Sequence, residues 1–159
     1  MVPIEIINKY YKESVVGITA ETLTDCDRWY NCIKEKPDYL QAVYTYVILY
    51  QQVYNGGFHQ YFANGYGLFG ELTIHYLIQI GATKCSAILQ EVMDAINTEG
   101  YSPEKLRKRI FNCDIPAIRD FDDTLWNKLE ALDKRYYDLE KEGEDIEALM
   151  AGYLVLKAG

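Results

Sequence analysis

Two histidines and four cysteines are the residues of this chain best suited to nucleophilic or metal chemistry. They are His59, His75, Cys26, Cys32, Cys85 and Cys113. The histidines are too far apart for a helical pair such as H-x-x-x-H, and no two cysteines form a C-x-x-C pair. His75 falls on an apolar helical segment, where a core or boundary position is usual, whereas His59 is expected to project from a corner. The spacing therefore predicts no catalytic residue, no metal site and no cofactor.

A second group of polar side chains lies in a short aromatic and amide motif. Its residues are Asn55, Gly56, Gly57, Phe58, Gln60, Phe62 and Asn64. In one interpretation the amides face a ligand beside the aromatic rings. In the other, the glycines form a sharp corner between two helices, the phenylalanines pack into the core at i and i+4, and the amides bond to exposed backbone ends. We favour the second interpretation, because amides are poor nucleophiles and poor bases.

Charge is the third feature with chemical consequences. The chain has 24 acidic and 16 basic residues, which gives a net charge of −8. Residues 111–150 contain 12 of the acids and five of the bases, so this quarter carries −7 and the rest of the chain −1. Such a chain is not expected to bind nucleic acid or an anionic membrane directly, since both need a basic face. A basic partner protein is favoured instead.

The acidic region has two interpretations. Its candidate partner-binding residues are Asp120, Asp122, Asp123, Glu130, Asp133, Asp138, Glu140, Glu144, Asp145 and Glu147. They form either a solvated outer face, with helical contacts such as Glu130 to Lys134, or an array of carboxylates that stands in for the phosphates of DNA. The basic run Lys105–Arg109 could pair with this region internally or in a second copy of the chain, which leaves a homodimer open.

The elements that position these residues all have helical periodicity, so we predict one all-α domain over residues 1–159 with about seven or eight helices. Thr24, Thr83 and Ser102 are expected to begin helices, and Pro37 suits a first helical position. A helical face should follow, formed by Leu40, Val43, Tyr44, Val47, Gln51 and Tyr54. Residues 68–80 should form a helix buried on all sides. The helix after it should face the core with Cys85, Ile88, Leu89, Val92 and Ile96. A later helix should do so with the stripe Leu125, Leu129, Leu132, Tyr136 and Leu139.

No segment has the pattern of a signal peptide or a membrane span. Residues 1–10 lack a basic region followed by an apolar one, and the most apolar stretch, residues 43–53, is interrupted by tyrosine and glutamine. Reduced cysteines are expected in such a chain. We therefore expect a cytoplasmic protein.

The Asn55–Asn64 motif resembles the signature of a bacterial family of acidic proteins. Residues 77–82, residues 129–137 and Tyr153 are similar to later segments of the same family, so the resemblance covers about residues 38–156. The best-understood family member is a DNA mimic that occupies the DNA-binding face of a transcription factor. The resemblance thus implies a helical protein without known enzymatic activity that acts as an acidic decoy.

Together these observations predict a non-enzymatic, acidic protein-binding module. Its expected partner is a basic protein, with a DNA-binding transcription factor as the example that the resemblance supplies. One alternative is a small-ligand-binding protein or enzyme with a pocket at the Asn55–Asn64 corner. Another is an immunity or assembly protein whose interface is rich in tyrosine, of which the chain has 15.

Overall fold

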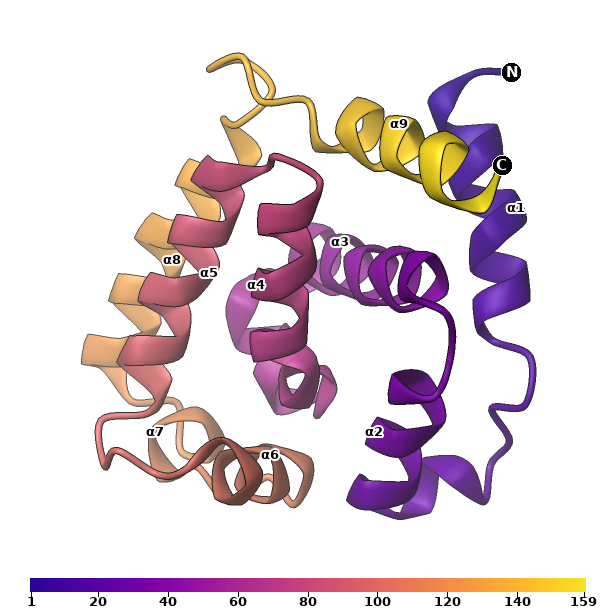
Figure 1. Ribbon diagram of the computed structural model, residues 1–159. Helices are drawn as coiled ribbons and strands as arrows, with labels where there is room; N and C mark the ends of the chain where they lie inside the picture. The colour runs from indigo at the N-terminus through magenta and orange to yellow at the C-terminus, as the bar shows by residue number, and fades with distance from the viewer.

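The computed structural model describes all residues from 1 to 159 and contains only helices (Figure 1). The α-helices are α1 (Pro3–Ser14), α2 (Cys26–Lys34), α3 (Asp38–Ala63), α4 (Gly70–Gln79), α5 (Thr83–Ile96), α6 (Pro103–Phe111), α7 (Pro116–Arg119), α8 (Asp123–Tyr137) and α9 (Ile146–Ala158). Two 3₁₀ helices are η1 (Thr22–Thr24) and η2 (Tyr66–Phe69). The predicted all-α fold is confirmed, and eight helices remain when the single turn of α7 is set aside.

Helix α3 forms the centre of the molecule. Every residue from Leu40 to Leu49 is buried, as expected for a helix surrounded by other helices. Pro37 precedes the helix as its N-terminal cap, one position earlier than predicted. At the other end Gly56 (φ −156°, ψ 20°) and Gly57 (φ 75°, ψ −177°) interrupt the helical backbone. Gly57 adopts a conformation that is almost restricted to glycine, so the predicted corner is confirmed.

The other helices pack around α3 on two sides. Helices α1 and α9 lie against each other and against α3, and both chain ends lie at their edge of the molecule (Figure 1). Helices α4 and α8 pack against α3 from the other side, with α5 between α4 and α8. A single cluster of 39 buried apolar residues runs through all these contacts. No helix is both long enough and apolar enough to cross a bilayer.

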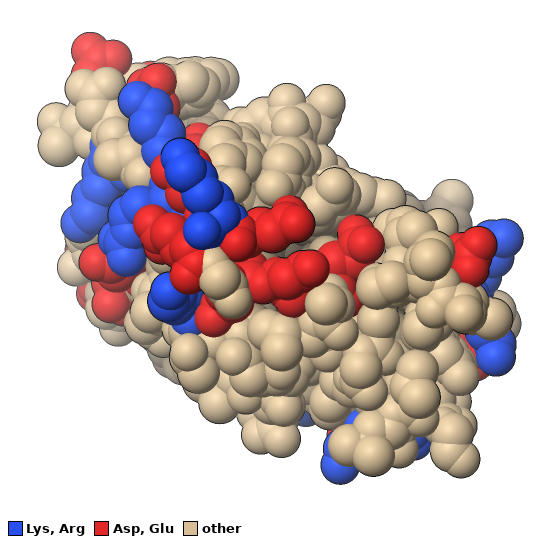
Figure 2. Space-filling model, turned by 90° about the horizontal axis from the view of Figure 1, so that it is seen from above, with Lys and Arg blue, Asp and Glu red and all other residues tan.

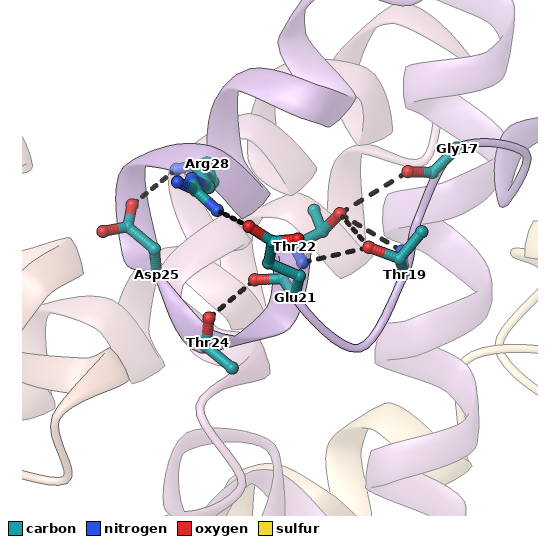
Figure 3. A network of polar contacts seen from close by, with 7 residues as sticks. All are labelled: Gly17, Thr19, Glu21, Thr22, Thr24, Asp25 and Arg28. Carbon is teal, nitrogen blue, oxygen red and sulfur yellow. Dashed lines mark hydrogen bonds and ion pairs between the residues drawn. The ribbon is translucent and has the colours of Figure 1, made fainter.

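The connection between α1 and α2 is held by local polar contacts (Figure 3). The carboxylate of Asp25 accepts the backbone N–H of Arg28 at 2.8 Å and so caps α2. The predicted cap, Thr24, is therefore wrong by one residue, and its hydroxyl donates to the carbonyl of Glu21 instead. The guanidinium of Arg28 completes the network by pairing with the Glu21 carboxylate at 2.7 Å. For the later helix α6, the predicted cap Ser102 is confirmed.

Two predicted helix faces differ from the structure. Gln51 and Tyr54 were expected to face the core, yet both are exposed, and Val53 is buried in their place. The second difference is α4, which was expected to be buried on all sides. Its residues His75 and Ile78 are exposed, because α3 and α5 cover only part of its surface. The core positions predicted for α5 and α8 are confirmed.

Candidate partner-binding surface

The ten acidic residues predicted to form one face fall into groups that differ in burial. Seven are exposed: Asp120, Asp122, Asp123, Glu130, Asp138, Glu140 and Asp145. Asp133 and Glu147 are partly buried, and Glu144 is buried. The residues near 120 and those beyond 138 lie at opposite ends of α8, whose 15 residues span about 22 Å. A single continuous acidic face is therefore not what the structure forms.

Several of these carboxylates bind other groups of the same chain. Asp122 accepts the N–H of Leu125 at 2.9 Å and caps α8. Asp145 accepts the N–H of Ala148 at 3.0 Å and caps α9. Asp120 forms an ion pair with its neighbour Arg119. These acids stabilise helix starts and a local turn, so they are less available to a partner than their exposure indicates.

Glu144 corrects the prediction most clearly, because it is a structural residue. It is only 8% exposed, and its two carboxylate oxygens accept the backbone N–H groups of Lys84, at 2.9 Å, and Cys85, at 2.7 Å. These groups belong to the first turn of α5, which has no side-chain cap of its own. Thr83, the predicted cap, is instead the first helical residue. A carboxylate from far along the chain thus satisfies the open end of α5.

Asp133 has a comparable role at the corner in α3. Its Oδ1 accepts the backbone N–H of Phe58 at 2.8 Å. Burial raises the pKa of this carboxyl, the Phe58 hydrogen bond lowers it, and Glu130 raises it further, with a net upward shift. The carboxylate also lies so close to Gly57 that a Cβ there would collide with it. Asp133 is therefore a support for the corner, and as a half-buried residue it is less available to a partner than the exposed acids.

Acidic residues are most concentrated in residues 138–147, here called the acidic segment, which leads from α8 into α9. Six of its ten residues are acidic: Asp138, Glu140, Glu142, Glu144, Asp145 and Glu147. Its single base is Lys141. The protein forms seven ion pairs, and none involves an acid of this segment. Figure 2 shows acidic side chains gathered on this end of the molecule, with basic side chains beside and among them on one side.

The basic run on α6 does not neutralise the acidic segment. Lys108 pairs with Asp27 and Glu104, and Arg109 pairs with Asp114 at 3.1 Å. Glu130 and Lys134, expected to be in contact on α8, form no ion pair either. The ammonium of Lys84 donates to the backbone carbonyl of Glu142 at 2.9 Å. No carboxylate of the acidic segment forms an ion pair, so the segment keeps an excess of acid.

The Asn55–Asn64 motif has the structural role that we favoured, with a different use of its amides. Phe58 and Phe62 are buried as predicted. The amides bond to one another and to Gln52, and they do not bond to backbone ends. Asn55 donates to Gln60 at 3.0 Å, and both Gln60 and Asn64 donate to the Oε1 of Gln52, at 3.0 and 2.9 Å.

His59 does not project from the corner. Its ring is buried, its Nε2 donates to the carbonyl of Ile118 at 3.0 Å, and Phe121 and Trp126 cover it at centroid distances of 4.6 and 4.8 Å. No residue from 55 to 64 lines any of the five main surface clefts. None of these five clefts therefore offers a ligand site at the corner.

Sequence reasoning missed a row of tyrosines beside the acidic segment. Tyr46, Tyr50 and Tyr54 follow one another at intervals of four along α3, with ring centroids 6.1 and 4.6 Å apart. Tyr54 also contacts Tyr136 and Tyr137. The spacing of four was a usable signal, because residues i and i+4 lie on the same side of a helix. What the sequence lacked was the position of α8 beside this row.

These features define a small, acidic, all-helical protein with one strongly charged segment. A family model described as DMP19-like protein matches residues 34–157, which is most of the chain, so the protein belongs to the DMP19-like family. The matched range contains the corner, the tyrosine row and the whole acidic segment. No curated protein and no solved structure matches the chain.

Proposed function

We propose that this protein acts by binding alone, and that its acidic segment occupies the basic surface of a protein that otherwise binds DNA. The observation that carries the proposal is the excess of acid in residues 138–147, which contain six acids, one base and no ion pair. Membership in the DMP19-like family supports it, since the best-understood relative is a DNA mimic.

The physical basis is a match of charge density. Double-stranded DNA carries about one negative charge per 1.7 Å of axis. A short segment with several carboxylates, held between two packed helices, presents a comparable local density on a rigid support. The field of such a patch attracts a basic groove before contact and favours the correct orientation. Competition with DNA follows because both ligands need the same basic residues.

No observation favours the alternative of a ligand or catalytic site at the Asn55–Asn64 corner. The amides there are bonded to one another, and His59 is buried under two aromatic rings. We therefore assign the corner a scaffolding role in the proposed function.

The test uses two variants with the same change in net charge. The segment variant is D138N/E140Q/E142Q/E147Q, which spares the helix-capping Glu144 and Asp145. The control variant is E13Q/E35Q/E71Q/E99Q, in which four exposed acids without ion pairs are neutralised elsewhere. Each protein is immobilised and exposed to a lysate of the source organism, and retained proteins are eluted with salt or with duplex DNA.

The proposal requires a DNA-binding protein that is retained by the wild type and by the control variant, released by duplex DNA, and lost with the segment variant. Equal retention by the segment and control variants would overturn it. Retention that duplex DNA does not reduce would also overturn it, because a DNA mimic and DNA must compete for one surface.

A further inference from the structure

A shallow groove runs between the acidic segment and the tyrosine row. Its rim consists of the exposed lining residues Tyr50, Tyr54, Glu140 and Asp145. The bottom of the groove includes the buried residues Tyr46 and Tyr136. Aromatic faces and carboxylates therefore border the same narrow space, although they come from distant parts of the chain.

The rim tyrosines are unusually open for such large side chains. Tyr50 is 41% exposed, Tyr54 53% and the adjacent Tyr137 40%. Tyr137 is fixed by its hydroxyl, which donates to the carbonyl of Val53 at 2.6 Å. The rings of Tyr50 and Tyr54 support each other at 4.6 Å. Exposed aromatic rings that are already ordered lose little conformational freedom on binding, as is typical of interface anchors.

Elsewhere in this protein, tyrosine rings already hold its own cations. The guanidinium of Arg107 lies 4.1 Å from the centre of the Tyr30 ring, and that of Arg109 lies 4.6 Å from the Tyr101 ring. No lysine or arginine of the chain lies over Tyr50, Tyr54 or Tyr137. The groove thus combines the ring faces that accept a cation with the exposed carboxylate of Glu140, which forms no ion pair.

We propose that this groove binds arginine side chains of the partner, with the guanidinium stacked on Tyr50 or Tyr54 and paired with Glu140. The inference rests on the proposed function in that it assumes a basic protein partner. It adds that the partner is recognised by arginine in particular. A planar, weakly hydrated guanidinium stacks on an aromatic face and pairs with a carboxylate at the same time, whereas a lysine ammonium is more strongly hydrated.

The Tyr54 ring remains suitable for this contact over the physiological pH range. Burial raises the pKa of Tyr54, and the nearby Tyr50 and Glu140 raise it further. The phenol of Tyr54 therefore stays neutral. A neutral ring presents the negative face of its π-system to a cation. An ionised phenolate would instead attract lysine as well as arginine.

The experiment compares fluorescein-labelled nona-arginine and nona-lysine peptides, which have equal length and charge. Binding is measured by fluorescence anisotropy at about 0.1 M salt, where exposed charges still interact. The proteins are the wild type, Y50L/Y54L, Y50F/Y54F and the segment variant. Leucine keeps apolar bulk without an aromatic face, and phenylalanine keeps the face without the hydroxyl. Circular dichroism and thermal unfolding confirm that each variant is folded.

We expect the wild type to bind nona-arginine about five- to thirtyfold more tightly than nona-lysine, the range for two exposed cation–π contacts. Y50F/Y54F should keep this preference, and Y50L/Y54L should lose it while still binding both peptides. An equal affinity of the wild type for the two peptides would overturn the inference, as would an undiminished preference in Y50L/Y54L.

The same data separate this inference from the proposed function. If the wild type binds both peptides equally and the segment variant binds neither, recognition by charge stands and recognition of arginine falls. If the segment variant binds nona-arginine as tightly as the wild type, the acidic segment is not the binding element and both proposals fall. Failure of the wild type to bind either peptide would also remove both.

Discussion

The backbone N–H of Phe58 donates a hydrogen bond of 2.8 Å to the carboxylate of Asp133, 75 residues further along the chain. Phe58 follows the glycine corner and begins the second helical part of α3, whose first N–H groups have no partner within the helix. Asp133 supplies that partner from α8. The corner motif and the acidic helix, which look independent in the sequence, are thus one structural unit.

This contact predicts different effects for two substitutions of Asp133. Asp133→Ala leaves the Phe58 N–H without an acceptor and should lower the free energy of unfolding by about 1–3 kcal/mol. Asp133→Asn keeps an oxygen acceptor and should unfold at or above the wild-type urea midpoint at neutral pH. Glu130→Gln, an exposed change on the same helix, is the control and should have little effect. Equal losses for the alanine and asparagine variants would contradict the assignment.

The raised pKa of Asp133 also predicts a pH dependence of stability. The folded protein holds this proton more tightly than the unfolded chain, because burial disfavours the ionised form. The stability that this carboxyl contributes is therefore present below its unfolded pKa, near 4, and is lost as pH rises through the folded pKa. Asp133→Asn does not titrate, so its free energy of unfolding should increase relative to the wild type from pH 3.5 to pH 7. The measurement is urea unfolding of both proteins across that range. A difference in free energy of unfolding between them that stays constant with pH would contradict the prediction.

Gly57 should be the least replaceable glycine of the corner. Its φ of 75° and ψ of −177° are almost inaccessible to other residues, and a Cβ would collide with Asp133. The matched control is Gly100→Ala, at φ 68° with open space around the site, which should cost about 1–2 kcal/mol. Gly57→Ala should lower the free energy of unfolding by more than this control does, as measured in the same denaturant titration. A smaller loss at Gly57 would mean that the corner readily rearranges.

Replacement of Glu144 should affect folding although it lies in the charged segment. Its carboxylate accepts two backbone N–H groups of α5, so Glu144→Ala should lower the free energy of unfolding by roughly 2–4 kcal/mol. Glu140→Ala, four residues earlier and exposed, should change it by less than about 0.5 kcal/mol. Thermal unfolding of the two variants provides the comparison. The prediction fails if both changes are equally mild.

The four cysteines should differ in their reactivity with iodoacetamide. Cys113 is exposed, whereas Cys26 and Cys85 are buried. Burial raises the pKa of both buried thiols, and nearby acids, Asp27 for Cys26 and Glu144 for Cys85, raise it further. Since the thiolate is the reactive form, mass spectrometry of the native protein should show alkylation of Cys113 first and of Cys85 only after unfolding. Early modification of Cys85 would indicate that α5 opens readily.

The parts of the fold that the sequence predicted correctly are those set by local rules. Helical periodicity identified the buried faces of α5 and α8, and paired glycines identified the corner in α3. Ser102 was found as a cap because serine before proline is a strong local signal. Thr24 was chosen wrongly because Asp25, its neighbour, is at least as good a cap.

The site was predicted less well because its assignments depend on contacts between distant segments. Nothing local distinguishes Glu144, which caps α5, from Glu140, which faces solvent. His59 was placed outside because Phe121 and Trp126, which cover it, come from the connection after α7 and from α8. Charge composition located the acidic segment correctly, but only the packing of α3 against α8 brings the tyrosine row beside it.

The pairing of α1 with α9 has a consequence for synthesis on the ribosome. Helix α1 is made before α3 and can dock on it early, but the surface that it shares with α9 has no partner until α9 emerges. Contacts between such distant segments form late, because the chain must close a long loop to make them. Helix α1 is therefore translated before the rest of this fold yet reaches its final environment late, and apolar residues on its α9-facing side stay open to water or to chaperones until translation has passed α9.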